Sequence, residues 1–450
     1  MFVLRKPVVF AIVAAALLLC VGGLAPRVAC AQEETAQPTT EDATTPMREA
    51  PTVPTNETWG TYDPGKGYLV AKTSKGELAI SAYGLLRYLN QMPGSQTYTD
   101  HLGVKHDVDT REDIYPHRVI VWLKGWMFDP KLIYTFTLWT VNTTDQDAIF
   151  VNIGYQFHRR FQLYAGIAGN AGTRSILGSH PYWLGHDRVM ADEFFRPFFG
   201  SGIYANGELF RGFWYNAQIG NSNSILGVKA SDLDRNQTVS GSMWYMPTGE
   251  FGPRGAYGDY EMHENVAMRI GASACYSPEQ SFVGSGTSKN TTLKLADAVN
   301  VFDEGALAPG VTVQNVDYKV LAVDFGVKYK GIFVQAEHYI RWLDKFVADG
   351  ALPVGEIIDN GFYVQAACYP VPKKLEAYVA TSQIYGDEEA GFDKADEYIV
   401  GTNFYPFDTR DTRLNLQYIS VNHSPVGSTF GYYTAGQTGS TISVAYSLMF

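Results

Sequence analysis

The feature that most constrains this chain is an alternation of apolar with small or polar residues, which recurs along most of its 450 residues. In the segment 266–276, Met268 and Ile270 fall on one face, whereas Arg269 and Ser273 fall on the other. Successive side chains of a β-strand point to opposite sides of the sheet, so a period of two predicts a strand. The sequence therefore predicts an all-β chain.

Sixteen segments of this kind follow one another, and their connections alternate between short and long. We place the segments at 77–90, 115–128, 132–142, 147–157, 161–169, 199–209, 212–221, 239–247, 264–276, 316–329, 332–343, 360–370, 374–384, 396–406, 411–422 and 440–450. Two connections depart from the alternation. The connection 143–146 is short where a long one is expected, and 248–263 is long where a turn is expected.

This pattern is typical of a transmembrane antiparallel β-barrel, with tight turns at one end and long loops at the other. A secreted β-sandwich or propeller is the alternative, because these folds also contain many short strands. The second face of the segments is poor in charge, and only 18% of all residues are charged, which favours the barrel. Aromatic residues near the segment ends favour it too, because barrels carry aromatic girdles at the membrane interfaces. These are Trp122, Trp126, Trp139, Trp214, Tyr215, Trp244, Tyr245, Trp342, Tyr369 and Tyr405.

The last segment ends the chain on an aromatic residue. Tyr446, Leu448 and Phe450 share its apolar face, and we interpret these three residues as an outer-membrane assembly signal. Closed barrels of sixteen strands leave an aqueous channel, whereas eight-stranded barrels are filled by side chains. A barrel of about sixteen strands therefore predicts a pore.

The N-terminal region differs from the rest in composition. Arg5 and Lys6 precede an apolar stretch, and small residues surround Cys30, so residues 1–31 are predicted to be a cleaved signal peptide. Residues 32–60 are rich in Thr, Pro and Glu and are predicted to be a disordered periplasmic tail. The barrel domain is expected at 61–450. The net charge of −11 argues against nucleic acid as a partner.

If the apolar faces point to lipid, the polar faces bring nine charged side chains into the barrel. The five basic ones are Arg87, Arg269, Lys328, Arg341 and Arg413, and the four acidic ones are Glu208, Asp324, Glu337 and Glu376. Rings of basic side chains favour anions and rings of acidic ones favour cations. Five basic and four acidic side chains do not decide between a preference for anions and a preference for cations. Each of these side chains can also be explained as one that simply contacts pore water.

Three stretches resemble the phosphate-selective porin O and P family. They are GKGYLVAKTSKGELAISAYGLLRYLNQ at 65–91, DRVMADEFFRP at 187–197 and VDFGVKYKG at 323–331. The resemblance covers about residues 60–450 in order and length. It implies a sixteen-stranded and usually trimeric outer-membrane channel, which loops constrict and basic residues line for anions.

By analogy with porins, the long loop 170–198 is expected to fold into the pore. Arg174, Arg188 and Arg196 are then the expected constriction residues, although Asp192 and Glu193 could equally pair with these arginines and hold the loop against the wall. The loop 386–396 carries five carboxylates, which could bind a divalent cation or cation-bridged lipopolysaccharide, or could be simply solvated. Its acidity puts a strong phosphate preference in doubt.

Enzyme signatures such as G-x-S-x-G, H-E-x-x-H and the P-loop do not occur in the sequence. We therefore expect no catalytic residue, no cofactor and no metal site. The sequence predicts a porin for passive diffusion of small hydrophilic solutes, with a mild anion preference, in contact with lipids and lipopolysaccharide. The alternatives are a structural or adhesive barrel that binds a surface partner through its loops, and a barrel-embedded hydrolase.

Overall fold

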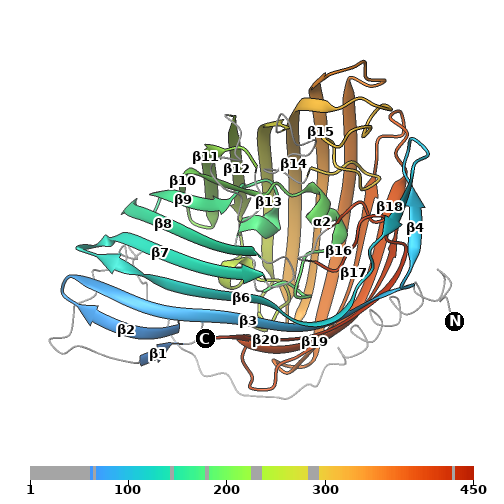
Figure 1. Ribbon diagram of the computed structural model, residues 1–450. Helices are drawn as coiled ribbons and strands as arrows, with labels where there is room; N and C mark the ends of the chain where they lie inside the picture. The colour runs from blue at the N-terminus through green and yellow to red at the C-terminus, as the bar shows by residue number, and fades with distance from the viewer. Residues whose placement is uncertain are drawn as a thin grey trace.

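The computed structural model describes residues 61–63, 67–141, 146–177, 182–223, 236–281, 293–427 and 431–450. The predicted signal peptide and tail lie outside these residues. Sixteen antiparallel strands form a closed barrel, in which each strand pairs with the next and the last strand pairs with the first (Figure 1). Among the described residues, no helix is long and apolar enough to cross a membrane.

All sixteen predicted segments are strands of the barrel wall, and their bounds differ from the prediction by a few residues. In order around the wall they are β3 (Gly76–Met92), β6 (Glu112–Met127), β7 (Asp129–Val141), β8 (Gln146–His158), β9 (Phe161–Gly169), β10 (Phe199–Phe210), β11 (Phe213–Asn221), β12 (Gln237–Tyr245), β13 (Ala267–Gln280), β14 (Val313–Tyr329), β15 (Ile332–Ala348), β16 (Glu356–Val371), β17 (Leu375–Tyr385), β18 (Lys394–Phe404), β19 (Thr412–Asn422) and β20 (Gly439–Met449).

Four short strands outside the wall were not predicted. β1 (Thr61–Asp63) and β2 (Gly67–Thr73) continue the sheet beside the first part of β3, which is the part that β20 does not reach. β4 (Gln96–Thr99) and β5 (Lys105–Val108) form a hairpin in the first long loop. Each has only three to seven residues, which is too short for a clear alternation.

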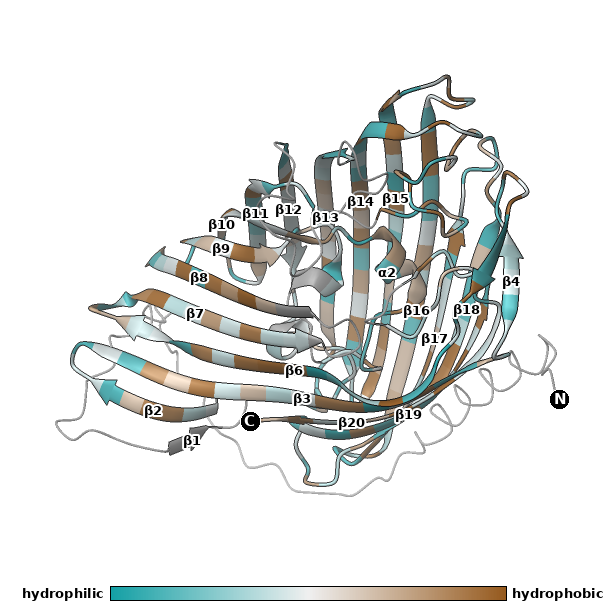
Figure 2. Cartoon of the chain, in the orientation of Figure 1, coloured by the Kyte–Doolittle hydropathy of each residue, from teal (hydrophilic) through white to brown (hydrophobic). Residues whose placement is uncertain are grey.

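The outer face of the wall is apolar, as the alternation predicts. Ile149, Ile153 and Leu416 are among the large apolar side chains that are half or more exposed to solvent in the isolated chain. The bands of contrasting hydropathy along single strands show the same alternation (Figure 2). Exposed apolar area of this extent is stable only against lipid or another apolar surface.

The interior is filled by segments that fold inward from both ends. The long loop 170–198 carries η2 (Arg174–Leu177) and α2 (Met190–Phe195), and the segment 246–266 between β12 and β13 carries η4 (Pro253–Gly255). Buried residues of both segments pack in one cluster with inner faces of β13 to β19. The prediction that 248–263 is unusually long is confirmed, and this segment enters the barrel from the end with the short turns.

The predicted aromatic girdle is wrong for several of its members. Trp122 and Trp139 pack in an inner cluster with Tyr83 and Ile120, and Trp244 lies inside beneath Arg269. Trp126, Tyr369 and Tyr405 are buried. A position near the end of a strand does not determine whether a side chain points to the outside or to the inside of the barrel. Trp139 and Trp244 lie against the guanidinium groups of Arg118 and Arg269, and Tyr369 and Tyr405 contact Tyr260 of the inward segment 246–266.

Tight turns close the end opposite the long loops. Between β14 and β15, Tyr329 pairs with Ile332, and Lys330 and Gly331 both have positive φ, at 46° and 82°. Two consecutive positive φ angles are typical of the type I′ turn, whose twist matches that of a β-hairpin.

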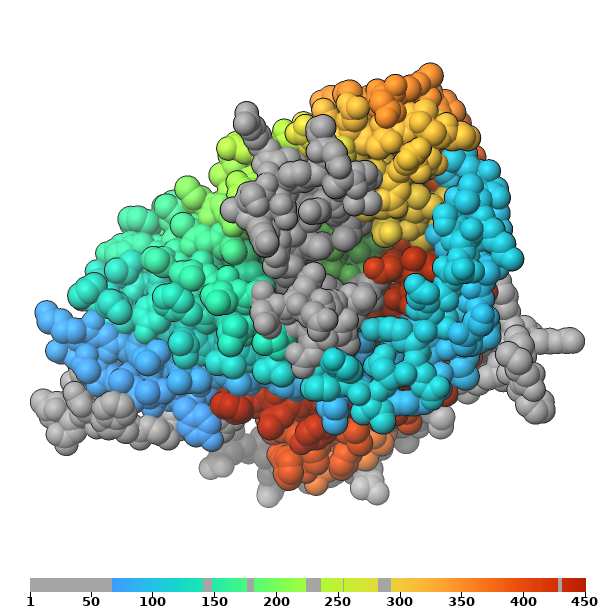
Figure 3. Space-filling view, in the orientation of Figure 1, coloured from blue at the N-terminus to red at the C-terminus, as the bar shows by residue number. Residues whose placement is uncertain are grey.

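The β4–β5 hairpin lies across the end with the long loops. The His101 Nδ1 contacts Asp297 Oδ2 at 2.6 Å, and Gln96 accepts a hydrogen bond from the Thr438 backbone N–H. In the space-filling view the cyan residues of this region lie beside the red and orange ones (Figure 3). Within the hairpin, Asp100 Oδ2 lies 2.7 Å from His106 Nε2. The hairpin therefore joins loops that are far apart in sequence.

Candidate functional site in the barrel interior

The five basic residues predicted for the polar faces lie on the inner face of the wall. Their exposed fractions are 5% or less. The acidic residues predicted with them are buried as well, so the interior holds both signs of charge. Whether these side chains line a conducting path stays a prediction. The basic residues are Arg87 on β3, Arg269 on β13, Lys328 on β14, Arg341 on β15 and Arg413 on β19.

One carboxylate is shared by two arginines. Arg87 Nη1 donates to Asp187 Oδ2 at 2.9 Å, and Arg118 Nη2 donates to Asp187 Oδ1 at 2.8 Å. The Nε and Nη2 of Arg87 and the Nε of Arg118 are buried without a hydrogen-bond partner among the described residues. Beside them, both ring nitrogens of the buried His117 are also without one. This corner of the interior therefore carries an excess of positive charge and of unpaired donors.

A bulge explains why Arg118 could not be placed from the sequence. Leu85 pairs with Arg118 and Leu86 pairs with Pro116, so His117 is an extra residue in β6. A bulge shifts the alternation by one residue and can turn two consecutive side chains inward. His117 and Arg118 are accordingly both buried.

Arg413 and Arg341 hold loops against the wall. Arg413 donates to the backbone carbonyls of Trp183 and Gly185 at 2.5 and 2.9 Å. Arg341 donates to Asp359 Oδ2 from Nε at 3.0 Å and from Nη2 at 2.5 Å, and its guanidinium lies 4.0 Å from the ring centre of Phe194 in α2. Both residues therefore fix the position of the loop 170–198.

A second charged cluster joins β13, β14 and β15 to the same loop. Arg269 Nε donates to Asp324 Oδ1 at 2.9 Å, and Arg174 Nε lies 3.6 Å from the same oxygen. The Arg174 backbone N–H donates to Glu337 Oε1 at 2.7 Å. The Arg174 guanidinium covers the Tyr257 ring at 4.1 Å. This cluster contains two arginines and two carboxylates, whereas two arginines share one carboxylate at Asp187.

Arg188 and Arg196 are paired with neighbouring carboxylates. Arg196 contacts Glu193 with two hydrogen bonds, at 2.8 and 2.6 Å, and Arg188 Nε lies 3.6 Å from Asp192 Oδ2. Burial lowers the pKa of Arg188 to about 10, with Arg196 adding to the effect. Burial raises the pKa of Asp192, and Arg188 opposes this rise. The pairing with Asp192 and Glu193 that the sequence left open is therefore present.

The inward segment 246–266 is a part of the interior that sequence reasoning did not assign to the site. Lys328 Nζ donates to the carbonyls of Phe251 and Ala256 at 2.6 and 2.8 Å. Arg174 Nη2 donates to the Gly255 carbonyl at 2.6 Å. Buried cations of the wall and of the loop 170–198 thus bind backbone carbonyls of this segment. The only feature of the sequence that could have indicated this segment was the unexpected length of the connection between β12 and β13.

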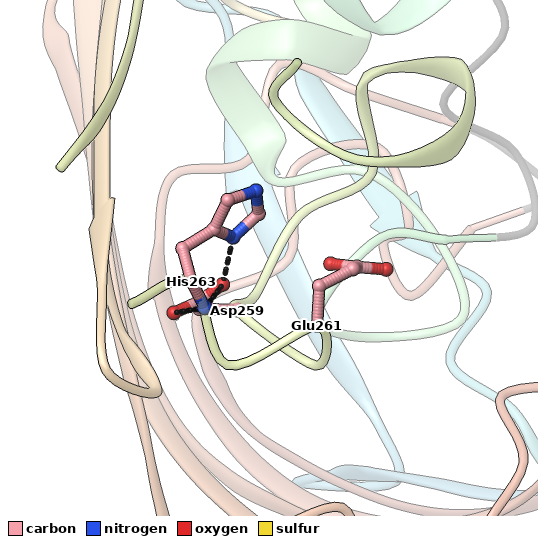
Figure 4. Close-up of side chains that lie close together, drawn as sticks. All are labelled: Asp259, Glu261 and His263. Carbon is pink, nitrogen blue, oxygen red and sulfur yellow. Dashed lines mark hydrogen bonds and ion pairs between the residues drawn. The ribbon is translucent and has the colours of Figure 1, made fainter. Parts of the chain in front are cut away.

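A group of possible metal ligands pins the same segment to the wall. Ligand atoms of Asp259, Glu261 and His263 lie within 4.8 Å of one another. In Figure 4 the His263 ring contacts Asp259, at 2.5 Å, while Glu261 stands apart. Asp259 Oδ2 accepts a bond from the Gly331 backbone N–H at 2.7 Å, and Glu261 lies 3.4 Å from Arg410. These contacts occupy both carboxylates, so the group serves as a structural pin.

The acidic loop has no comparable group. The only cluster of three or more possible ligands among the described residues is the one around Asp259, and the loop 386–396 is described throughout. Asp387 instead accepts backbone N–H groups of Ile358 and Glu389, at 2.8 and 3.0 Å. The loop therefore uses this carboxylate to cap its own turn.

Two cavities lie between these groups, each of about 10 Å³. A cavity of this size holds about one water molecule. One of them is lined in part by Arg410 and Arg413, and the other in part by Asp187 and Arg188. Both cavities are therefore small, and charged and apolar side chains line them together.

The assembly signal lies where the barrel closes. Phe450 exchanges two backbone hydrogen bonds of 3.0 Å with Ala82 of β3, and its ring lies 5.7 Å from that of Tyr68. Tyr446 and Leu448 are exposed on the outer face of β20. Their role as a signal stays a prediction.

No protein-family model matches this sequence, and no curated protein matches it. The resemblance to the O and P porins therefore rests on the three motifs alone. Among solved structures the chain is similar to the outer-membrane expressed OmpT of Vibrio cholerae, with 10% identity over 84% of this chain and 99% of that chain and a TM-score of 0.49. It is similar to an anion-selective porin from Comamonas acidovorans, with 12% identity over 83% and 100% and a TM-score of 0.48. It is also similar to the outer membrane channel DcaP of Acinetobacter baumannii, with 9% identity over 85% and 99% and a TM-score of 0.46.

Proposed function

We propose that this protein is an outer-membrane porin through which small hydrophilic solutes diffuse, with a mild preference for anions. The observation that carries the proposal is a closed sixteen-stranded wall that is apolar outside and charged inside. Barrels of this size enclose a water-filled channel. A signal peptide at 1–31, contact with lipopolysaccharide and assembly as a homotrimer belong to the same proposal.

The anion preference is supported by the corner around Asp187. Two buried arginines share one carboxylate there, and three of their nitrogens, Nε and Nη2 of Arg87 and Nε of Arg118, have no acceptor among the described residues. N–H donors of this kind can take the place of water molecules in the hydration shell of an anion, and this stabilises the anion. The clusters around Asp324 and Glu193 are closer to neutral, so we expect a mild preference rather than a strict selectivity.

The test is single-channel conductance with reversal potentials in potassium chloride gradients. We expect small conductance steps, because the loop 170–198 and the segment 246–266 pack against the inner face of the wall, and a reversal potential that indicates weak anion preference. Surface carboxylates of the loops attract cations over about 10 Å at 0.1 M salt, and this attraction fades as salt rises. Anion preference should therefore increase between about 0.01 and 1 M.

Arg188→Ala is the variant for the constriction, and we expect it to reduce the anion preference. Cation selectivity that persists at high salt would contradict the proposal, and so would an Arg188→Ala channel identical to the wild type. A protein that inserts into the bilayer but never conducts would favour the structural or adhesive role.

A further inference from the structure

Basic side chains gather on four tight turns, or within three residues of them, at one end of the barrel. These turns join β2 to β3, β6 to β7, β8 to β9 and β10 to β11. They are linked in pairs, since Phe128 N–H donates to the Lys75 carbonyl and Glu208 N–H donates to the Arg159 carbonyl, at 2.8 and 3.1 Å. We name this set the basic rim: Lys75, Lys131, Arg159, Arg160 and Arg211.

Acidic groups do not neutralise the basic rim. Arg159 pairs with Glu208, which is itself buried. Asp129 accepts bonds from the Lys131 backbone N–H and from the Tyr155 hydroxyl, at 2.9 and 3.0 Å. Among the described residues, the side chains of Lys75, Lys131, Arg160 and Arg211 have no ion pair within 4 Å, although the charge of Lys131 acts on Asp129. The net charge of the whole chain is −11.

Exposed aromatic rings border the same turns. Phe128 is 75% exposed, and Phe157, Phe161 and Phe210 are 51%, 42% and 56% exposed. Phe157 and Phe161 stack with their ring centres 5.6 Å apart. Rings beside cations at the ends of membrane strands are typical of the boundary between acyl chains and headgroups.

We infer that the basic rim is a binding surface for anionic phospholipid headgroups in the membrane leaflet that borders the tight turns. Clustered Lys and Arg beside a membrane attract anionic lipid, while the phenylalanines insert among the acyl chains. Charge complementarity selects this occupant, because the rim carries five cations against the two nearby carboxylates, Glu208, which pairs with Arg159, and Asp129, and so keeps an excess of positive charge. The inference rests on the proposed function only in placing the barrel in a membrane with its turns in the periplasm.

The experiment compares how strongly spin-labelled phosphatidylglycerol and spin-labelled phosphatidylcholine associate with the refolded full chain in phosphatidylcholine vesicles. For the wild type we expect association with phosphatidylglycerol to be about fivefold stronger at low salt. In the triple variant Lys131→Gln, Arg160→Gln, Arg211→Gln, the ratio of phosphatidylglycerol association to phosphatidylcholine association should approach one. The preference should also weaken as salt rises, because salt screens exposed charges.

The matched control is the triple variant Lys330→Gln, Lys373→Gln, Lys374→Gln, which removes the same charge from turns elsewhere on the same end. It should keep the wild-type ratio. Spectra are taken only from protein that shows the heat-modifiable mobility of a folded barrel, so a misfolded variant is not counted. A wild-type ratio of one, an equal loss in the control, or a rim that selects an acidic protein or glycan over phosphatidylglycerol would overturn the inference. Conductance of the same samples separates this result from the proposed function, since a silent barrel can still select lipid.

Discussion

Replacement of Asp187 by asparagine tests whether the interior is held together by its charges. The two carboxylate oxygens receive Arg118 and Arg87 at 2.8 and 2.9 Å, and all three side chains are at least nine-tenths buried. Asparagine has nearly the same shape but leaves two buried guanidinium groups facing each other without a counter-charge.

The expected cost follows from this geometry. Removing one partner of a buried ion pair typically costs about 3–5 kcal/mol, because the remaining charge stays desolvated. Asp187→Asn should therefore lower the free energy of unfolding by about 3 kcal/mol or more. It should also shift the reversal potential further toward anions, since the corner gains one net positive charge.

Asp408→Asn is the matched control. Asp408 lies 3.7 Å from Lys374, and both side chains are more than half exposed. Exposed pairs contribute about 0–1 kcal/mol, so this variant should stay close to the wild type. Urea unfolding in detergent, followed by tryptophan fluorescence, measures both variants. Equal stabilities for Asp187→Asn and the wild type would refute the reasoning, and unchanged selectivity would remove Asp187 from the anion path.

Three further predictions concern assembly, orientation and the loops. Deleting Phe450 removes two hydrogen bonds of the closing seam, and it should reduce the folded fraction in heat-modifiable mobility assays; an unchanged fraction would contradict the assembly signal. Met268→Arg places a charge on the lipid face at a cost of about 2–4 kcal/mol, so it should reduce insertion. Arg269→Leu leaves the lipid face apolar and should alter ion selectivity, with a loss of stability because Asp324 keeps only the more distant Arg174. Equal insertion of both variants would mean that the face assignment is wrong. Burial would raise the pKa of Asp100, but hydrogen bonds from His106 and from backbone N–H groups outweigh it and hold the pKa below the ordinary 3.8. The stability that Asp100 gives the hairpin is thus complete above pH 3.8 and lost as the pH falls further. The protection of the hairpin amides, measured as the exchange rate relative to the intrinsic rate at the same pH, should fall there, and Asp100→Asn should show the same low protection at neutral pH.

The barrel could be predicted from the sequence because its signal is local. A membrane strand is apolar on one face and small or polar on the other, so each strand shows its period of two without any partner. In β13 the faces of Met268 and Arg269 follow directly from this alternation. The signal fails where one extra residue interrupts it. In β6 the one signal is Pro116, because a proline inside a strand is typical of an edge or a bulge. It does not say at which residue the alternation shifts, so Arg118 could not be assigned to a face.

The candidate site was harder to predict from the sequence, because it depends on contacts between segments that are far apart in the chain. Arg413 contacts a loop more than two hundred residues earlier in the chain, and no local pattern encodes such a contact. The segment 246–266 was noticed only for its length, since polar and aromatic residues there have no period. The same limit applies to the aromatic residues, because an inward tryptophan and an interfacial one share the same composition.

The seam between β3 and β20 has a consequence for how the chain reaches its membrane. β3 is the first strand of the wall and β20 is the last, and they are hydrogen-bonded along ten residue pairs. An incomplete chain would expose two long sheet edges with unpaired backbone N–H and C=O groups. Lipid offers these groups no hydrogen-bond partner, and in water such edges pair with other chains. The wall can therefore close only after the final residues have been exported. Any truncation or premature stop should leave an open sheet for degradation or aggregation, and a shorter barrel should not form in its place.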